Sequence, residues 1–335
     1  MLAKRIAVDL GTVNTLVYVP KKGVVVNEPS VVALNSDNND IIAIGTEAEE
    51  MLGRTPEALI SHQPLQDGVI ADFRITREML KHYMNQAIGR YRLVKPDVMV
   101  TLPAGATSTE RRAVIDATLA AGARAAHIIE EPVAAALGAG VNVTQAHGSM
   151  VIDIGGGTTE IAVISLGGVV AQSSVRVGGN KIDAAIADYV RKQHNLSIGE
   201  HTAQEIKHTI GRAVLENQKH TMDVRGRDIV GGLPKTISLS DGDIIDPIQD
   251  ILHQIVLSIR GVIEDTPPEL VSDVIDRGII LTGGGSQLRD IDTLLTKVVN
   301  VPILRADEPH LCVVKGAGLA LNNLSEYQKS LLSSV

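Results

Sequence analysis

The sequence is poor in aromatic residues: its 335 residues include one Phe, five Tyr and no Trp. Functions that stack bases or sugar rings on aromatic side chains, such as single-stranded nucleic-acid binding, are therefore disfavoured. Hydrophobic residues nevertheless make up 44% of the chain. This aliphatic content excludes intrinsic disorder and predicts a core built mostly from Val, Ile, Leu and Ala.

Cysteine and positive charge are also in short supply. The single cysteine, Cys312, lies in an apolar stretch and is expected to be a buried thiol. One cysteine excludes a disulfide within the chain, which fits a reducing compartment. The formal net charge is −8, from 31 basic and 39 acidic residues. Because such a molecule repels polyanions, we expect no nucleic-acid partner.

Long hydrophobic runs are missing as well. The longest uncharged run, residues 132–152, contains a proline, several glycines and polar side chains, so it is not expected to cross a bilayer as a helix. No apolar stretch precedes Asp9, so no secretory signal is expected.

Strand-like and helix-like segments alternate along the chain, which predicts an α/β fold with helix-covered sheets. We expect strands near residues 6–10, 16–19, 24–34, 98–102, 128–129, 150–154, 160–165, 169–177 and 278–281. We expect helices from 76, over 107–121, 133–139, 180–194, 202–215 and 247–265, and from about 287. The length suggests about two domains, and no Pro/Ser-rich linker separates them, so they are expected to pack along a cleft.

Helix starts are predicted from capping residues. Capping boxes are predicted at Thr107 with Glu110 and at Thr202 with Glu205, Thr76 is predicted to cap its helix, and Asp246 is predicted to cap a helix with Pro247 in its first turn.

One motif occurs twice: a strand, an Asp, a Gly turn with small or hydroxyl residues, and a second strand. The copies span residues 8–17 and 152–161, with Asp9 and Asp153 in matching places. Such turns let backbone N–H groups approach phosphate oxygens, and each Asp can face a hydrated Mg²⁺. The hydroxyls that add donors are those of Thr12, Thr15, Thr158 and Thr159. A single copy is better explained as an ordinary hairpin, but the duplication favours two turns that clamp a triphosphate.

A glycine turn at residues 283–285 follows an apolar strand and precedes a predicted helix. This arrangement suits a nucleotide that lies against a helix N-terminus. The turn alone is weak support, and it matches neither a Walker A motif nor the spacing of a dinucleotide-binding fold.

Together with residues 130–136 and 315–318, these motifs resemble the two phosphate, the adenosine and the two connecting motifs of the actin, heat-shock chaperone and sugar-kinase ATPase superfamily. Within it, the chain closely resembles the MreB family of bacterial actins. Residues 27–33, 67–73, 110–113 and 267–270 carry this closer resemblance, which spans nearly the entire chain.

The resemblance implies an actin-like fold of two duplicated domains around a nucleotide cleft. The first domain would comprise residues 1–145 and 313–335, with a small subdomain at about 33–65. The second would comprise residues 146–312, with a small subdomain at about 182–245.

The resemblance also implies the roles of individual residues. Asp9 and Asp153 would hold Mg²⁺ largely through water, and Glu131 would orient the water that attacks the γ-phosphate of ATP. The nucleotide would contact Thr12, Val13, Asn14, Gly155, Gly156, Gly157, Thr158, Gly178, Gly179, Asp183, Glu205, Ile206, Lys207, His208, Gly284, Gly285, Ser286 and Gln287. Without the resemblance, Glu131 is better explained as a surface carboxylate at the start of a helix. Glu205 and Lys207 can equally be explained as part of a solvated helix face.

Three functions suit a cleft ATPase: a small-molecule kinase acting on a sugar or acetate, a peptide-binding chaperone, or a filament. The first two would need additional segments that these 335 residues lack, so we expect a slowly hydrolysing ATPase that forms homopolymeric filaments of paired protofilaments. The resemblance implies rod-shape maintenance, with the cell-wall elongation machinery and its membrane adaptors as partners.

The resemblance further implies a cytoplasmic protein that is peripheral at the inner face of the cell membrane. Leu93 and Val94, between basic residues, are the predicted membrane contact; an ordinary turn explains them equally well.

Overall fold

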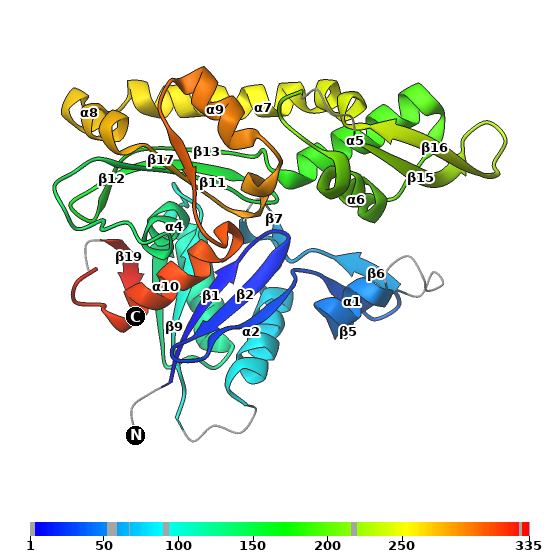
Figure 1. The fold of residues 1–335 in the computed structure, drawn as a ribbon. Coiled ribbons are helices and arrows are strands. Elements are labelled where there is room, and N and C mark those ends of the chain that lie inside the picture. Colours follow the sequence, from blue (N-terminus) through cyan, green and yellow to red (C-terminus); the bar gives the residue numbers. More distant parts are fainter. Residues whose placement is uncertain are drawn as a thin grey trace.

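The computed structural model describes residues 4–51, 59–66, 68–89, 94–215, 220–327 and 330–334, and these form two halves that each contain one large sheet (Figure 1). The first half has six strands in the order β19-β10-β9-β1-β2-β3, and the second has five in the order β13-β12-β11-β17-β18. The strands of the first sheet are β1 (Arg5–Leu10), β2 (Asn14–Val19), β3 (Gly23–Pro29), β9 (Asp97–Leu102), β10 (Ala125–Glu130) and β19 (Leu331–Ser334). Those of the second are β11 (Ser149–Ile154), β12 (Thr159–Ser165), β13 (Gly168–Val175), β17 (Ile279–Thr282) and β18 (Ile303–Arg305).

The two large sheets share one topology. β1 pairs antiparallel with β2 and parallel with β9, just as β11 pairs antiparallel with β12 and parallel with β17. The duplicated motif therefore builds the same strand–turn–strand unit in both halves. Asp9 and Asp153 occupy corresponding places, next to the turn of each hairpin.

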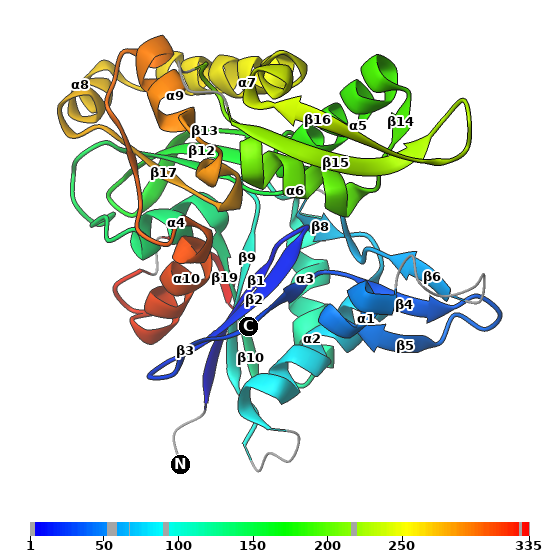
Figure 2. The same ribbon diagram turned by 45° about the vertical axis from the view of Figure 1, so that its right-hand side comes forward.

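Three smaller sheets extend the two halves. The first, β5-β4-β6, consists of β4 (Val32–Asn35), β5 (Ile41–Ile44) and β6 (Leu59–His62) and packs against α1 (Thr46–Met51). The second, β14-β15-β16, consists of β14 (Leu196–Ser197), β15 (Thr221–Asp228) and β16 (Pro234–Ser240) and packs against α5 (Gly179–His194) and α6 (Glu200–Ile210). The third is β7 (Leu65–Gln66) with β8 (Val69–Ile70). The two three-stranded sheets lie on the same side of the molecule (Figure 2).

The helices cover the sheets and join the halves. They are α2 (Phe73–Ile88), α3 (Ser108–Ala120), α4 (Glu131–Gly138), α5 (Gly179–His194), α6 (Glu200–Ile210), α7 (Asp241–Glu264), α8 (Pro268–Arg277), α9 (Ile291–Val299) and α10 (Cys312–Asn322), with the 3₁₀ turns η1 (Gly284–Gln287) and η2 (Pro309–Leu311). The predicted domain boundary at 145/146 falls between α4 and β11, and the one at 312/313 falls one residue into α10. Both boundaries stay predictions.

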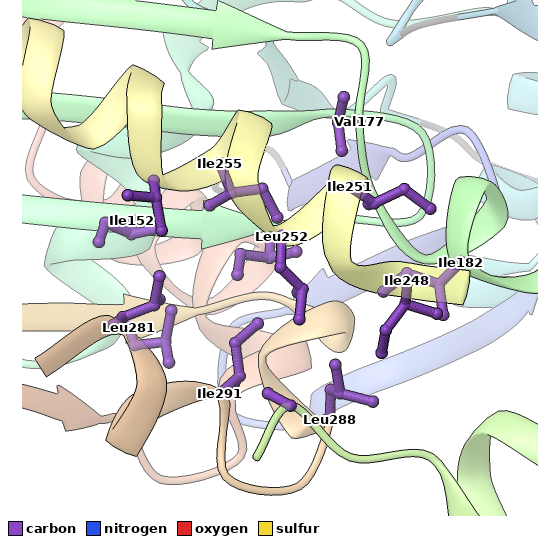
Figure 3. Packing of buried hydrophobic residues seen from close by; sticks show 14 of the residues in the cluster. Ile152, Val177, Ile182, Ile248, Ile251, Leu252, Ile255, Leu281, Leu288 and Ile291 are labelled. Carbon is purple, nitrogen blue, oxygen red and sulfur yellow. The ribbon is translucent and has the colours of Figure 1, made fainter. Parts of the chain in front are cut away.

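The core is aliphatic, as its composition predicts. In the second half, one face of α7 contributes Ile248, Leu252 and Ile255 to the core: Leu252 and Ile255 lie toward Ile152 and Leu281 of the sheet, and Ile248 lies beside Ile182 (Figure 3). Each such side chain, fully buried, contributes roughly 1.5–3 kcal/mol through removal of apolar surface from water. Cys312 is buried, as expected from the sequence.

Helices α4 and α10 cross in close contact between the two sheets. A Cβ on Gly138 would lie 1.8 Å from the carbonyl oxygen of Cys312, and one on Gly316 would lie 1.8 Å from that of Ala134. Only glycine permits this approach. The helix pair shares one hydrophobic cluster with Met99 of the first sheet and Val151 of the second, so it joins the two halves.

The predicted starts of three helices were wrong, although the helices exist. α2 begins at Phe73 behind Asp72, whose side chain accepts a hydrogen bond from the Ile75 amide, so Thr76 lies inside the helix. α6 begins at Glu200 behind Gly199 without a side-chain cap, so the box predicted at Thr202 and Glu205 does not form. The box at Thr107 and Glu110 is confirmed.

The third wrong start is that of α7. The helix begins six residues before Pro247, and the Ser240 amide donates to the Asp243 carboxylate at 2.8 Å at its start. Proline inside a helix removes one backbone hydrogen bond. The buried side chains of Ile244 and Ile245 offset this loss by adding apolar contacts before the proline.

The glycine turn at 283–285 also differs from its prediction. It leads into η1, and the next α-helix, α9, begins only at Ile291. The turn therefore presents backbone groups of a short 3₁₀ segment rather than the N-terminus of an α-helix.

Candidate functional site

A cleft of about 490 Å³ lies between the two halves and is lined by both hairpins of the duplicated motif. Of the predicted site residues, those that line it are Asp9, Thr12, Val13, Asn14, Glu131, Asp153, Gly155, Gly156, Gly157, Thr158, Gly179, Lys207, His208, Gly284, Gly285 and Gln287. The structure thus brings together residues from six separated stretches of the sequence.

Side-chain hydroxyls hold the first hairpin. Ser30 Oγ donates to the Gly11 carbonyl at 2.6 Å and lies 2.8 Å from Thr15 Oγ1. The Gly68 amide donates to Thr12 Oγ1 at 3.0 Å. The Ser30 amide also donates to the Val13 carbonyl at 2.7 Å, so side-chain hydroxyls and backbone bonds together fix the turn, while the Val13 side chain lies toward Gly156 of the other half.

Backbone groups hold the second hairpin. The Gly155 amide donates to the Thr158 carbonyl at 2.8 Å, and the amides of Gly179 and Asn180, at the start of α5, donate to the carbonyls of Gly155 and Gly156 at 3.0 and 2.9 Å. The N-terminus of α5 is thus bonded directly to the turn.

The two hairpins approach each other so closely that the second needs glycine. A Cβ on Gly156 would lie 2.1 Å from Val13 Cγ2, and one on Gly157 would lie 2.9 Å from Thr12 Oγ1. Neither position has room for a side chain. A ligand at the hairpin tips is therefore contacted from both halves at once.

The two aspartates are held in the same way. Thr101 Oγ1, on β9, donates to Asp9 Oδ1 at 2.8 Å, and Thr282 Oγ1, on β17, donates to Asp153 Oδ1 at 2.6 Å. Burial raises the pKa of Asp9 to about 7, the bond from Thr101 opposes the rise, and the charge of Asp153 adds to it. Burial likewise raises the pKa of Asp153 to about 6, against the bond from Thr282.

Glu131 is the first residue of α4, is 8% exposed, and faces the cleft. Burial raises its pKa well above the usual range, and the charges of Glu160, Asp9 and Asp153 raise it further. Several carboxylates thus gather in one buried place, a situation that a bound cation relieves.

Lys207 forms part of the opposite wall. Its Nζ donates to Asp183 Oδ2 at 2.8 Å and to the Gly179 carbonyl at 3.3 Å, which links α6 to the start of α5. Burial raises the pKa of Asp183, and the Lys207 partner opposes this rise. The amine is thereby fixed beside the second hairpin.

Five of the predicted nucleotide contacts do not line the cleft. Gly178 caps α5, Asp183 is buried behind Lys207, and Ser286 is buried, with its hydroxyl donating to the Gly283 carbonyl at 2.6 Å. Ile206 lies in the hydrophobic core, and Glu205 is exposed. Their predicted contacts with the nucleotide stay predictions.

Sequence reasoning missed an ion-pair network behind the cleft wall. The buried Arg212 donates to Asp290 at 2.6 and 3.0 Å and to Asp241 at 3.3 Å, and the Ala213 amide donates to the Arg289 carbonyl at 2.8 Å. These partners lie up to 78 residues away, so no local pattern signals them. The lining residues that were not among the predicted nucleotide contacts are Gly11, Leu16, Asn27, Gly68, Asn180, Ile182, Gln204, Gly211, Gly283, Leu288, Arg289, His310 and Val313.

The cleft carboxylates do not form a metal cage of their own. Among the residues that the structure describes, no three His, Cys, Asp or Glu side chains group so as to hold a metal ion by themselves. No helix in the described part of the chain has the length and apolar character to span a bilayer. Of the two predicted membrane contacts, Val94 is half-buried, whereas Leu93 lies outside the described residues.

Comparisons with known proteins agree with this geometry. The family model for the MreB/Mbl protein matches residues 3–329. The cell shape-determining protein MreB of Escherichia coli strain K12 is 46% identical over 99% of this chain and 97% of its own length. The cell shape-determining protein Mbl of Bacillus subtilis strain 168 is 43% identical over 99% of this chain and 100% of its own.

Solved structures are similar over the same extent. The crystal structure of Spiroplasma citri MreB5 bound to ADP has a TM-score of 0.92 at 37% identity and covers 98% of both chains. A MamK double helical filament has a TM-score of 0.78 at 20% identity, covering 94% of this chain and 98% of that one, and shows a shared fold.

The two halves share one strand topology, their hairpins face each other, and each half holds one aspartate through a threonine hydroxyl. These features, with the similar solved structures, define an actin-like ATPase fold and confirm the predicted fold class. The sequence matches identify the family more specifically than the fold does, because they extend over nearly the whole chain at 43% and 46% identity. The chain belongs to the MreB/Mbl family. The predicted family is thereby confirmed, and the bacterial-actin interpretation is favoured over that of a small-molecule kinase.

Proposed function

We propose that this chain binds ATP with Mg²⁺ in the cleft, hydrolyses it slowly, and couples that cycle to assembly into filaments that maintain rod cell shape. The observation that carries the proposal is the pair of facing hairpins, each with a buried aspartate anchored by a threonine from the neighbouring parallel strand. Solved structures of Spiroplasma citri MreB5 bound to ADP and to AMPPNP support nucleotide binding in this fold.

The phosphates would lie between the hairpin tips. Thr12, Val13 and Asn14 would contact them from the first half, and Gly155, Gly156, Gly157 and Thr158 from the second. Backbone N–H groups in such turns bind anions without a side chain in the way, which fits the lack of space beyond Gly156 and Gly157. The adenosine would lie along the wall that includes Lys207, His208, Gly284 and Gln287.

The donor set fits Mg²⁺. Asp9 and Asp153 each have one carboxylate oxygen bonded to a threonine, both line the cleft, and their pKa values are raised by burial and, for Asp9, also by the charge of Asp153. Mg²⁺ is usually bound through one or two carboxylates, waters and substrate phosphates rather than by a cage of side chains. When bound, the ion would neutralise charge on the phosphates and keep both aspartates ionised.

Glu131 would orient the attacking water. Its place at the first turn of α4 holds the carboxylate at the cleft from a rigid helix. The water oxygen would bond to the γ-phosphorus while the bond from that phosphorus to the bridging oxygen of ADP breaks. Glu131 would accept a hydrogen bond from the attacking water, and a proton of that water would pass to the released phosphate.

Substitution of Glu131 tests the catalytic part. Glu131→Ala is expected to bind ATP with affinity close to that of the wild type and to release phosphate about 100-fold more slowly, because a carboxylate that positions the attacking water contributes about that much. Glu130→Ala, which alters the adjacent half-buried carboxylate, serves as the matched control. An equal loss in both variants would remove Glu131 from the role.

Sedimentation tests the filament part. Protein with ATP and lipid is expected to pellet as filaments visible by electron microscopy, while protein without nucleotide stays in the supernatant. Failure to assemble on lipid both with and without ATP would refute the filament claim. ATP turnover that rises with a sugar or with acetate would support the kinase alternative instead.

The proposal extends to partners and location: the filaments would lie at the inner face of the cytoplasmic membrane and bind the cell-wall elongation machinery through membrane adaptors. Leu93 and Val94 would insert into the bilayer. Val94→Phe is then expected to increase sedimentation with anionic liposomes, since a larger apolar side chain gains more on insertion. Val230→Phe, at an exposed site on the β15–β16 turn, is the control.

A further inference from the structure

Glu160 is a buried acidic residue to which the proposed reaction assigns no role. It lies on β12 with no exposed surface, and it does not line the cleft. Both of its carboxylate oxygens are hydrogen-bonded: Oε1 accepts from Ser174 Oγ at 2.6 Å, and Oε2 accepts from the Ala104 amide at 3.1 Å. A buried charge is costly even when it is bonded, so its presence in the core calls for an explanation.

The two donors to Glu160 come from different halves. Ser174 lies on β13, in the second sheet beside β12. Ala104 follows β9 of the first sheet, two residues after that strand ends. The bond from the Ala104 amide therefore crosses from one half to the other.

The Ala104 segment is in turn connected to the first hairpin. The neighbouring Pro103 leaves no space for a Cβ on Gly68, which would lie 2.3 Å from Pro103 Cγ. The Gly68 amide donates to Thr12 Oγ1. A continuous series of contacts thus runs from Glu160 through Ala104, Pro103 and Gly68 to Thr12 at the cleft.

Glu160 also lies beside the groups that would act on the nucleotide. It is the cross-strand partner of Asp153, and the strand that carries it contacts α4, the helix that begins with Glu131. Among the neighbouring charged groups that raise the pKa of Glu131, Glu160 has the largest effect. The crossing bond therefore involves a residue that neighbours both Asp153 and Glu131.

We propose that Glu160 is a positioning residue for ATP hydrolysis: by accepting hydrogen bonds from Ala104 of one half and Ser174 of the other, it fixes the spacing of Glu131 and the two hairpins. The inference rests on the proposed ATPase function. It concerns the alignment of the halves for the chemical step, so it affects hydrolysis more than nucleotide affinity, since small errors in alignment slow a reaction strongly.

The test compares Glu160→Ala with Glu160→Gln in the full chain. The glutamine carbonyl accepts from the Ala104 amide and its NH₂ donates to the Ser174 hydroxyl oxygen, so Gln keeps both bonds and loses only the charge. Glu160→Ala is expected to lower the rate of phosphate release about 10-fold, with affinity for a fluorescent ATP analogue within about 3-fold of wild type. Glu160→Gln is expected to stay within about 3-fold in both measurements.

Hydrogen exchange at the Ala104 amide reports the crossing bond without any need for hydrolysis. Exchange is expected to be faster in Glu160→Ala and unchanged in Glu160→Gln. Unchanged exchange in Glu160→Ala would overturn the inference. A Glu160→Gln variant that loses hydrolysis like Glu160→Ala, with Ala104 still protected, would also overturn it, because the charge rather than the bonds would then matter.

A milder variant covers the case in which Glu160→Ala does not fold. Ser174→Ala removes one bond to Glu160, and Ser173→Ala, the preceding residue on β13, is its control. We expect Ser174→Ala to slow phosphate release about 3-fold and Ser173→Ala to leave it unchanged. Equal rates in the two would count against the inference. Failure of the ATPase proposal itself would show separately, as a Glu131→Ala variant with undiminished phosphate release.

Discussion

The two halves of the molecule share a strand topology but hold their hairpins by different means. The hydroxyls of Ser30 and Thr12 help to fix the first hairpin, in addition to a backbone bond from Ser30 to Val13, whereas backbone bonds to the start of α5 fix the second. The tip of the second hairpin consists of glycines, because the side chains of the first hairpin pack directly against it. Duplication thus preserved the scaffold, while the facing surfaces became complementary rather than identical.

The halves also differ in the helix to which each sheet connects. In the first half, β10 leads into α4, which begins with Glu131. In the second, β18 leads through η2 into α10, which begins with Cys312. The two helices cross each other, yet only one presents a carboxylate at the cleft. A duplicated fold can therefore carry a matched pair of buried aspartates and a single glutamate with no counterpart in the other half.

The largest effect is expected at the crossing of these two helices. Gly138→Ala and Gly316→Ala each place a Cβ 1.8 Å from a backbone carbonyl oxygen, which a side-chain rotation cannot relieve. We expect each to reduce the free energy of unfolding by about 3 kcal/mol or to prevent folding. Thermal unfolding measures this, with Gly261→Ala as control because nothing lies within 4 Å of its Cβ. A tolerated Gly316→Ala would show that the two helices are not equally constrained.

The next effect tests the complementarity of the hairpins. In Gly156→Ala the new Cβ would lie 2.1 Å from Val13 Cγ2, so the hairpins should separate and ATP affinity should fall about 10-fold. The added substitution Val13→Ala removes the clashing atom and should restore part of the affinity. Titration with a fluorescent ATP analogue measures both, and no recovery in the double variant would contradict the described packing.

The aspartate anchors test how equivalent the halves are. Thr101→Val and Thr282→Val each remove one hydrogen bond to a buried carboxylate, and such bonds to charged groups contribute about 1.5–3 kcal/mol. Each should weaken Mg²⁺-dependent ATP binding about 10-fold. Affinity measured against Mg²⁺ concentration decides the point: a strong effect from only one variant would mean that a single aspartate holds the ion.

A smaller effect concerns pH. The pKa of Asp9 rises on folding from 3.8 to about 7, and that of Asp153 from 3.8 to about 6, mainly through burial. The folded state thus binds more protons than the unfolded state between about pH 4 and 7, so the metal-free protein loses stability as pH rises through this range. We expect this contribution to lower the Tm by about 2–4 °C between about pH 5.5 and 7.5.

Amide variants check that assignment. Asp153→Asn and Asp9→Asn should weaken the pH dependence of the Tm, because the group that binds the extra proton is gone. Added Mg²⁺ and ATP should raise the Tm of wild type and raise that of either variant less. A pH dependence unchanged in both variants would place its origin elsewhere in the chain.

The duplicated hairpins and the capping box at Thr107 could be predicted because their signals are local. The start of α7 could not, because the apolar contacts of Ile244 and Ile245 outweigh the local preference of Pro247 for a first turn. Arg212 and Glu160 were missed for a related reason. Their partners come from distant segments, and in sequence each is an ordinary charged residue.

The close crossing of α4 and α10 has a mechanical consequence. With backbone packed against backbone, the helices cannot separate without losing this packing, so we expect a rotation of one half against the other to occur about this crossing. Displacement then grows with distance from the crossing. The sheets β4–β6 and β14–β16 lie far from α10 (Figure 1), so a small rotation about the crossing would displace these two sheets more than the strands beside it.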